Sequence, residues 1–294
     1  MHIFGRLGLT VAALAMFPGA WPGQADPTTV SFAFDWRNEM IFVPVRVNGS
    51  RPLSFVLDTG SARNLIDRSL ATALGLKASG TGSLQGAGAG RIPVSFIHNV
   101  SIAFPGMESG GYEFSTADLQ PLKASLGVTV DGILGYEVFS RFVVTVDYQA
   151  KRLTLTAPEA FHPPSDAAQM LPIELRGKWA FAKAELELPG PVAVQDTFMI
   201  DSGSGDAVDH PIVMTLKSRV AATSGVGLGA AVQGATAKAL SLRLGRYAVA
   251  GPIVSCCGAT EATSKLIGNE VLRRFTVTFD YPGLRMFITP NSNF

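Results

Sequence analysis

Cysteine is nearly absent from this chain of 294 residues, and its two cysteines, Cys256 and Cys257, are adjacent. Adjacent cysteines exclude an ordinary long-range disulfide within the chain and a metal site built from several thiols. We expect two buried free thiols, because cysteine often serves as a small apolar side chain. The alternative is a strained bridge between the two neighbours in an oxidising compartment.

Charged residues are also few, at 16%, and the formal net charge is only +1. The chain therefore has no basic field that would attract nucleic acid, and we expect no nucleic-acid partner. Histidine occurs four times with no pair at metal-ligand spacing: His2, His98, His162 and His210. Without a His or Cys cluster, we expect no metal site.

Long apolar runs are missing too, since the longest candidate, residues 7–17, has 11 residues and a membrane span needs about 20. This stretch follows Arg6 and precedes the small residues Gly23 and Ala25, which favour cleavage. We interpret residues 1–25 as a secretory signal peptide, with a membrane anchor as the alternative. The mature protein is then expected to be exported, periplasmic or secreted, without a stable membrane span.

Two short acidic turns are present instead, Leu-Asp-Thr-Gly-Ser at 57–61 and Ile-Asp-Ser-Gly-Ser at 200–204. Each follows an apolar run, and each is followed downstream by a matched segment, at 131–148 and at 265–281. This repetition indicates an internal duplication in which each copy contributes one carboxylate. We predict two lobes, residues 26–164 and 165–294, joined by a linker within 157–168 that is rich in proline and alanine.

Glycine and proline are frequent, at 31 and 18 residues, and they separate short alternating apolar segments typical of strands. Asn48-Gly49 predicts a hairpin whose second strand leads to Asp58, and the spacing of apolar residues predicts a short helix within 64–76. Glycine-rich segments at 80–90 and 225–234 predict mobile hairpin tips. Neither segment carries Gly-Lys-Ser/Thr between a strand and a helix, which argues against nucleotide binding.

If the lobes pack with pseudo-twofold symmetry, Asp58 and Asp201 face each other across the axis. Two carboxylates this close do not both ionise easily, so the pair holds one proton over a wide acidic range. Such a pair contains a general base and a general acid, and it can activate a water between them for attack on an amide carbonyl.

The two turns, with the elements Ile133-Leu134-Gly135 and Leu266-Ile267-Gly268, resemble the retropepsin and pepsin superfamily of aspartic proteases. The Asp-Gly-Ile-Leu-Gly…Phe…Val-Asp-Tyr ending of the first copy is similar to that of bacterial retropepsin-like aspartyl proteases. The resemblance covers nearly all of residues 30–290. It implies an all-β, two-lobed acid protease fold with short helices, in a monomer with two pseudo-symmetric lobes. It also implies that the Gly-rich loops act as flaps over an extended peptide.

The resemblance implies roles for specific residues. Asp58 and Asp201 would be catalytic, with no cofactor, and a peptide or protein substrate would lie between the lobes. The residues expected to support the two active-site turns are Thr59, Gly60, Ser61, Ser202, Gly203 and Ser204. Among these, the Thr59 and Ser202 hydroxyls would hydrogen-bond across the interface and lock the turns together. The hydrophobic-hydrophobic-Gly elements would pack behind the turns.

The second turn departs from the first because Asp206 and Asp209 follow it. These acids either raise the pKa values of the pair or simply begin a solvated helix, and we favour the helix cap because Asp is preferred there. Asp147 and Asp280 recur at equivalent places before hairpin turns, where a structural role is expected. The Gly-x-Ser-x-Gly spacing of a serine hydrolase is not met at Ser204.

Neither Gly-rich loop contains the tyrosine that pepsin-like enzymes usually carry in the first flap. We therefore keep a second function beside the aspartic endopeptidase. It is a catalytically silent peptide-binding or inhibitory protein that retains the two-lobed cleft.

Overall fold

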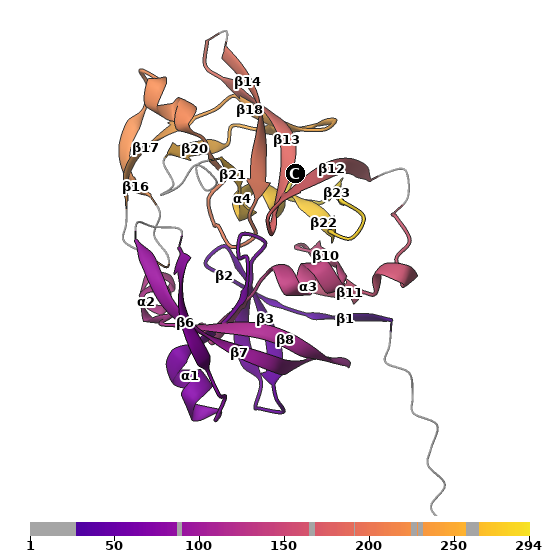
Figure 1. Ribbon diagram of the computed structural model, residues 1–294. Coiled ribbons are helices and arrows are strands. Elements are labelled where there is room, and N and C mark those ends of the chain that lie inside the picture. The colour runs from indigo at the N-terminus through magenta and orange to yellow at the C-terminus, as the bar shows by residue number, and fades with distance from the viewer. Residues whose placement is uncertain are drawn as a thin grey trace, which may run out of the picture.

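The computed structural model describes residues 28–86, 90–164, 168–190, 192–224, 228, 232–256 and 265–294. Figure 1 shows two β lobes, one above the other, with a central sheet at their junction. The all-β, two-lobed fold predicted from the sequence is confirmed. The predicted signal peptide and the predicted boundary at residue 165 lie outside the described residues, so both stay predictions.

The N-lobe is an eight-stranded sheet in the order β2-β3-β4-β9-β5-β8-β7-β6. Its strands are β2 (Asp35–Arg37), β3 (Met40–Val47), β4 (Leu53–Leu57), β5 (Asn64–Asp67), β6 (Ser79–Gln85), β7 (Arg91–Phe104), β8 (Met107–Ala117) and β9 (Gly132–Leu134). The β3–β4 hairpin predicted at Asn48-Gly49 is confirmed, with φ of 46° and 74° at the two turn residues. Positive φ at both positions matches the twist of the paired strands, and Asn and Gly tolerate it best.

The central sheet joins the two halves of the chain in the order β1-β11-β10-β22-β23-β12. Its strands are β1 (Thr29–Ala33), β10 (Val143–Asp147), β11 (Arg152–Thr156), β12 (Gln169–Arg176), β22 (Phe275–Asp280) and β23 (Arg285–Pro290). β10 and β22 are the matched strands of the two copies, and they pair antiparallel at its middle. There the hydroxyls of Thr145 and Thr278 hydrogen-bond over 2.9 Å. The pseudo-twofold axis of the duplication therefore passes between these two strands.

The C-lobe continues from β12 in the order β13-β14-β21-β15-β20-β17-β16, with β18 and β19 added beside β13. Its strands are β13 (Trp179–Leu188), β14 (Val192–Ile200), β15 (Val208–Asp209), β16 (Val220–Ser224), β17 (Val232–Lys238), β18 (Ser241–Leu244), β19 (Tyr247–Ala250), β20 (Ile253–Cys256) and β21 (Leu266–Ile267). In both lobes the strand that leads to the acidic turn pairs in parallel with a short strand that ends directly before a glycine. In the N-lobe β4 pairs with β9, which precedes Gly135, and in the C-lobe β14 pairs with β21, which precedes Gly268.

The helices are all short. They are α1 (Arg68–Ala73), α2 (Gln120–Leu126), α3 (Tyr136–Arg141), α4 (Asn269–Leu272) and the 3-10 turns η1 (Pro158–Ala160) and η2 (Pro211–Thr215). The helix predicted within 64–76 begins later than its first residues suggested, because Asn64–Asp67 join the sheet as β5. Asp67 then caps α1 by accepting hydrogen bonds from the amides of Ser69 and Leu70. No helix in the described part of the chain is long and apolar enough to cross a membrane.

Asp147 and Asp280 have structural roles, as expected, in the turns of the β10–β11 and β22–β23 hairpins. Asp147 accepts a hydrogen bond from the amide of Ala150, and Asp280 accepts one from the amide of Gly283. Asp280 also pairs with Arg285 at 2.7 Å. The structural interpretation of both acids is therefore confirmed.

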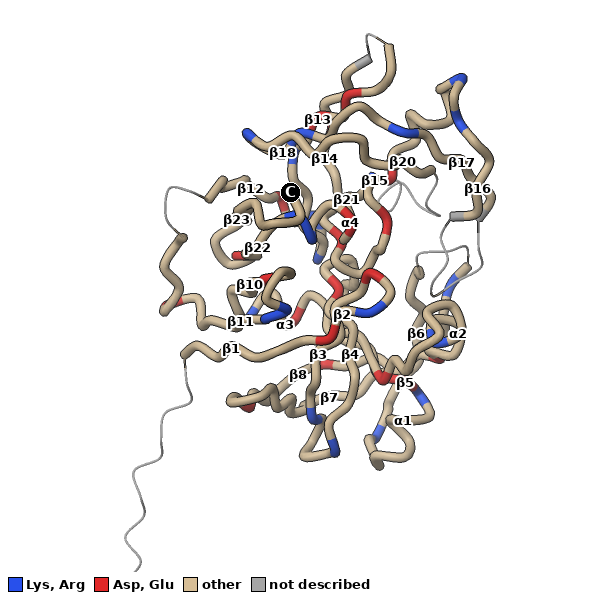
Figure 2. Tube along the Cα trace, turned by 180° about the vertical axis from the view of Figure 1, so that it is seen from behind, with Lys and Arg blue, Asp and Glu red and all other residues tan. Residues whose placement is uncertain are grey.

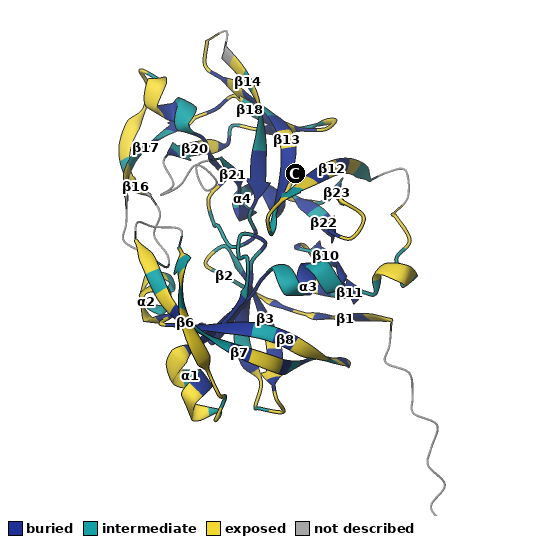
Figure 3. Cartoon of the chain, viewed as in Figure 1, coloured by how far each residue is buried: buried dark blue, intermediate teal, exposed yellow. Residues whose placement is uncertain are grey.

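One main apolar core runs through both lobes and the central sheet. Figure 3 shows buried residues along the strands at the junction of the lobes, whereas β6 and β16 are largely exposed. A second apolar cluster lies on another face of the N-lobe sheet and includes Phe42, Val56 and Leu65. A smaller one lies on the C-lobe sheet and contains Phe181, Met199 and Leu266.

The two glycine-rich hairpins, β6–β7 and β16–β17, lie on the same side of the molecule (Figure 1). They come together at their tips, where a Cβ on Gly86 would lie 1.4 Å from the carbonyl oxygen of Leu228. The Leu228 side chain packs against the second apolar cluster, which belongs to the N-lobe. That cluster therefore faces the opposite lobe at the hairpin tips. Most of the second glycine-rich segment, including Gly225, is outside the described residues.

Candidate active site

The two acidic turns meet between the lobes, and each is fixed by the strand behind it. The amide of Asp58 donates to the carbonyl of Leu134 over 2.9 Å, and the amide of Asp201 donates to that of Ile267 over 2.9 Å. These carbonyls belong to the residues directly before Gly135 and Gly268. The hydrophobic-hydrophobic-Gly elements thus lie directly behind the turns.

Glycine is required at the end of each element because backbone crosses it closely. A Cβ on Gly135 would lie 2.5 Å from the carbonyl oxygen of Ser61, and one on Gly268 would lie 2.9 Å from that of Ser204. Both serines also receive a hydrogen bond there, from the amide of the residue after each glycine. The backbone carbonyls of Ser61 and Ser204 therefore contact these glycines. Their hydroxyls bond to the residues that follow, Ser61 by donating to the carbonyl of Arg63 over 2.7 Å and Ser204 by accepting from the amide of Asp206 over 3.2 Å.

Thr59 and Ser202 tie the two turns together across the lobes. The amide of Ser202 donates to the Thr59 hydroxyl over 2.8 Å, and the amide of Thr59 donates to the Ser202 hydroxyl over 3.0 Å. Each hydroxyl in turn donates to a carbonyl of the opposite strand, Thr59 to Ile200 over 2.7 Å and Ser202 to Leu57 over 3.0 Å. Both side chains are buried, so these four bonds fix the carboxyl groups relative to each other.

The carboxyl groups of Asp58 and Asp201 lie together at the centre of this arrangement, and each affects the pKa of the other. Each carboxyl group also accepts a hydrogen bond over 2.8 Å from the glycine amide of its own turn, Gly60 or Gly203. Each glycine packs against the opposite aspartate, and a Cβ on Gly203 would lie 2.2 Å from Asp58. The six predicted turn residues are therefore brought together with the two acids.

Both carboxyl groups are enclosed by the two lobes but keep some contact with solvent. Burial raises the pKa of Asp58 well above its ordinary value, and the nearby charge of Asp201 raises it further. Burial also raises the pKa of Asp201, while the Gly203 amide and the Asp58 side chain oppose that rise. The pair consequently retains a proton into a pH range where an isolated aspartate has lost it.

Asn269 is a further polar residue at this site that the sequence analysis missed. Its side-chain nitrogen donates to the carbonyl of Ser202 over 2.7 Å and to that of Glu39 over 2.8 Å. Its side-chain oxygen accepts a hydrogen bond from the Tyr148 hydroxyl over 2.9 Å. A signal was available, because the first copy has Tyr136 directly after its glycine where the second has Asn269.

A hairpin tip of each lobe reaches the acidic turn of the other. The indole nitrogen of Trp179, at the start of β13, donates to the carbonyl of Gly60 over 2.8 Å. From the N-lobe, Glu39 and Met40 approach Gly205, where a Cβ would lie 3.1 Å from Glu39. Acidic segments, red in Figure 2, follow one another through this junction from β15 and α4 to β2.

The acids after the second turn do not begin a helix, which corrects our expectation of a cap. Asp209 lies in β15 with only 4% of its surface exposed, and the cap of η2 is His210, which accepts a hydrogen bond from the amide of Ile212. Asp209 belongs to the strand because it pairs with Leu266 in the sheet. The alternative expectation, that the acids after the turn raise the pKa values of the pair, applies to Asp206, whose charge raises the pKa of Asp201.

Cys256 is disulfide-bonded, so the expectation of a free thiol there is wrong. The only other cysteine, Cys257, lies outside the described residues. No group of three or more potential metal ligands occurs within the described ranges.

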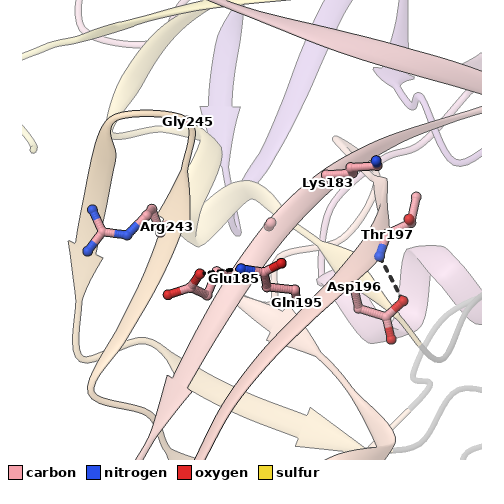
Figure 4. Close-up of a pocket in the computed structure, with 8 residues that line it drawn as sticks. Lys183, Glu185, Gln195, Asp196, Thr197, Arg243 and Gly245 are labelled. Atoms are coloured by element: carbon pink, nitrogen blue, oxygen red, sulfur yellow. Dashed lines mark hydrogen bonds between the residues drawn. The ribbon is translucent and has the colours of Figure 1, made fainter.

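A separate pocket of about 430 Å³ lies away from the two acids, on β13, β14 and the β18–β19 turn (Figure 4). Its lining includes Lys183, Glu185, Gln195 and Arg243. Gln195 donates to Glu185 over 2.9 Å within it. The pocket contains neither Asp58 nor Asp201, so the acidic turns form a distinct site.

Comparison with known proteins found one matching family. Residues 43–138 match a family model described as aspartyl protease. The matched segment contains the first acidic turn and Gly135, and it ends before the second half of the chain. A search of curated proteins found no match. The match supports protease chemistry of the aspartic type for the N-lobe site.

Proposed function

We propose that the protein is an exported aspartic endopeptidase that hydrolyses peptide bonds with a water activated by Asp58 and Asp201. The observation that carries the proposal is the meeting of the two acidic turns, one from each lobe, which the reciprocal hydrogen bonds of Thr59 and Ser202 hold together. Each acid stands in a matched turn with a glycine amide bonded to it. The family match at residues 43–138 supports the same reaction class.

The expected reaction begins with the pair in its singly protonated form. One carboxyl group of the pair holds the proton, and the other is the ionised base. The ionised carboxyl group removes a proton from water as the oxygen attacks the peptide carbonyl, and the protonated one donates its proton to the carbonyl oxygen. The carboxyl group that took the water proton then donates it to the amide nitrogen, while the other accepts a proton from a hydroxyl of the tetrahedral intermediate, and the carbon–nitrogen bond breaks to give an acid and an amine. The two carboxyl groups return to the singly protonated form.

The fixed geometry of the turns contributes by holding both acids in place before substrate arrives. The cross-lobe bonds of Thr59 and Ser202 join the strands that carry the acids. Displacement of a catalytic group by about 1 Å can lower a rate by roughly 100-fold. The reaction as proposed requires both lobes of one chain and is compatible with a monomer.

A peptide-cleavage screen tests the proposal. The mature protein, without residues 1–25, is incubated with a diverse peptide library from pH 3 to 8, and the products are identified by mass. Internal cleavage at acid pH that is absent from an Asp58→Asn, Asp201→Asn double variant supports the endopeptidase. Tight peptide binding without products would instead favour the silent peptide-binding protein. Export is tested separately, by locating the full-length protein and sequencing its N-terminus.

A further inference from the structure

A row of side chains crosses each lobe on the face that borders the other lobe. Residues paired directly in neighbouring strands point to the same side of a sheet, so the pairing defines the row. In the N-lobe it consists of Phe42, Val56, Ile133, Leu65 and Ser115. In the C-lobe it consists of Phe181, Met199, Leu266, Asp209 and Ser255.

These rows occupy equivalent places in the duplicated fold. Ile133 and Leu266 each lie two residues before the glycine behind an acidic turn, and Val56 and Met199 each lie two residues before the acid. The fourth position is therefore Leu65 in the N-lobe and Asp209 in the C-lobe. At this one position an apolar side chain in one lobe is matched by a carboxyl group in the other.

Both rows face the space between the lobes. In the N-lobe, Leu228 from the opposite hairpin packs against the cluster that contains Leu65. In the C-lobe, Trp179 packs against the cluster of Phe181, Met199 and Leu266, and it reaches across to the carbonyl of Gly60. A peptide lying over the two acids would therefore run between the row that contains Leu65 and the row that contains Asp209.

Asp209 is buried without the partners that a buried carboxyl group requires. Its residue is 4% exposed, and its Oδ1 atom has no hydrogen-bond partner. Burial raises the pKa of Asp209 to about 8, and the charges of Asp206 and Asp201 contribute to the rise. A buried polar atom left without a partner is destabilising, so a donor supplied by a ligand is favoured there.

We propose that Asp209 makes the C-lobe side of the cleft selective for a basic substrate side chain, lysine or arginine. The equivalent N-lobe position, with Leu65, takes an apolar side chain. A cationic group would supply the missing donor to Oδ1, and it would lie near three carboxyl groups, those of Asp201, Asp206 and Asp209. This inference rests on the proposed peptidase function and adds the class of side chain that the cleft recognises.

The preference for a basic side chain at Asp209 should depend on pH. Below about pH 8 the free Asp209 is protonated, and it must release that proton to pair with a cation. Affinity for a lysine side chain should therefore rise with pH between 5 and 8, by up to about tenfold per pH unit. Affinity for norleucine, which has a similar length and no charge, should not follow this trend.

The experiment compares peptides that differ only in lysine or norleucine at each position around the cleavage site. At one position the wild-type protein should cleave the lysine peptide at least tenfold faster, and Asp209→Leu, which copies the N-lobe, should reverse this order. Asp209→Asn should remove the charge preference with little change in shape. Leu65→Asp, the matched reciprocal variant, should create a basic preference at a position on the other side of the cleavage site.

A second readout separates this inference from the proposed function. Calorimetry with Asp58→Asn, and with Asp58→Asn combined with Asp209→Leu, measures binding of the same peptide pairs without cleavage from pH 5 to 8. Cleavage without any lysine preference, or a preference unchanged in Asp209→Leu, overturns the role of Asp209 and leaves the peptidase standing. Lysine-dependent binding without wild-type cleavage supports Asp209 and overturns the peptidase. A protein that neither binds nor cuts these peptides overturns both.

Discussion

Thr59 and Ser202 each accept the backbone amide of the other, so the two acidic turns are joined by reciprocal hydrogen bonds of 2.8 and 3.0 Å. The bonds are buried, and each hydroxyl also donates to the opposite strand. The contact between the lobes at the acids therefore depends on two hydroxyl groups.

Thr59→Val should destabilise the protein, because valine keeps the shape but leaves the Ser202 amide and the Ile200 carbonyl without partners. Each buried unsatisfied group costs about 1–3 kcal/mol, so we expect the free energy of unfolding to fall by about 2 kcal/mol or more. Urea unfolding followed by tryptophan fluorescence measures the change. Thr59→Ser, which keeps the hydroxyl, should lose only about 1 kcal/mol through its missing methyl group. Equal stability of Thr59→Val and wild type would contradict the account.

Gly203→Ala should abolish most of the proposed activity, because its Cβ would lie 2.2 Å from the Asp58 carboxyl group. The acid must move, and displacement on this scale lowers rates by about 100-fold or more. The measurement is kcat/KM on a cleaved peptide. Gly110→Ala is the matched control, since nothing lies within 4 Å of its Cβ, and it should keep the wild-type rate. A Gly203→Ala variant with wild-type kcat/KM would show that Asp58 does not need this position.

Asp206→Asn should shift the acid side of the pH–rate profile to lower pH. The charge of Asp206 raises the pKa of Asp201, so its removal lowers that pKa and keeps Asp201 ionised in more acidic solution. We expect a shift of up to about one pH unit, measured as kcat/KM from pH 3 to 8. Glu108→Gln, an exposed change on β8, serves as the control and should leave the profile in place. A shift of Asp206→Asn to higher pH would be the opposite of the expected sign.

Asp209→Asn should make stability less dependent on pH. The folded protein raises the pKa of Asp209 to about 8, whereas an unfolded chain has a value near 3.9. Between pH 5 and 7 the folded state keeps this proton and the unfolded state loses it. Stability from this group therefore falls by about 1.4 kcal/mol per pH unit as pH rises.

Asp209→Asn should lose this pH-dependent contribution to stability. The free energy of unfolding of wild type should therefore fall relative to that of the variant from pH 5 to 7. Urea unfolding at several pH values measures it. Asp35→Asn, whose side chain is 77% exposed, should show the wild-type slope. Parallel slopes for Asp209→Asn and wild type would mean that the carboxyl group is not held protonated in the fold.

The sequence predicted much of this site because the duplication repeats short local signals. Asp58 and Asp201 each follow a buried strand and precede a glycine, so their place at strand ends was evident from neighbouring residues. To predict that the two turns meet, only one further assumption was needed, that the lobes pack with pseudo-twofold symmetry. Asn48-Gly49 likewise predicted its hairpin because both residues tolerate positive φ.

Other features could not be predicted because they depend on distant strands. Asp209 resembles a helix cap in its local sequence, but its pairing with Leu266 places it in the sheet and buries it. The role of Asn269 depends on Tyr148 and Glu39, which are brought to it only by the packing of the lobes. Cys256 was assigned as a free thiol from its hydrophobic character, and the structure has it disulfide-bonded.

The central claim is that Asp58 and Asp201 act together on one peptide bond, and the most direct test is the cleavage rate of the single variants Asp58→Asn and Asp201→Asn. The account predicts that each variant, purified and folded, loses acid-pH cleavage by at least 1,000-fold, because one carboxyl group does not supply both acid and base. Retention of cleavage within tenfold of wild type by either variant would contradict the account.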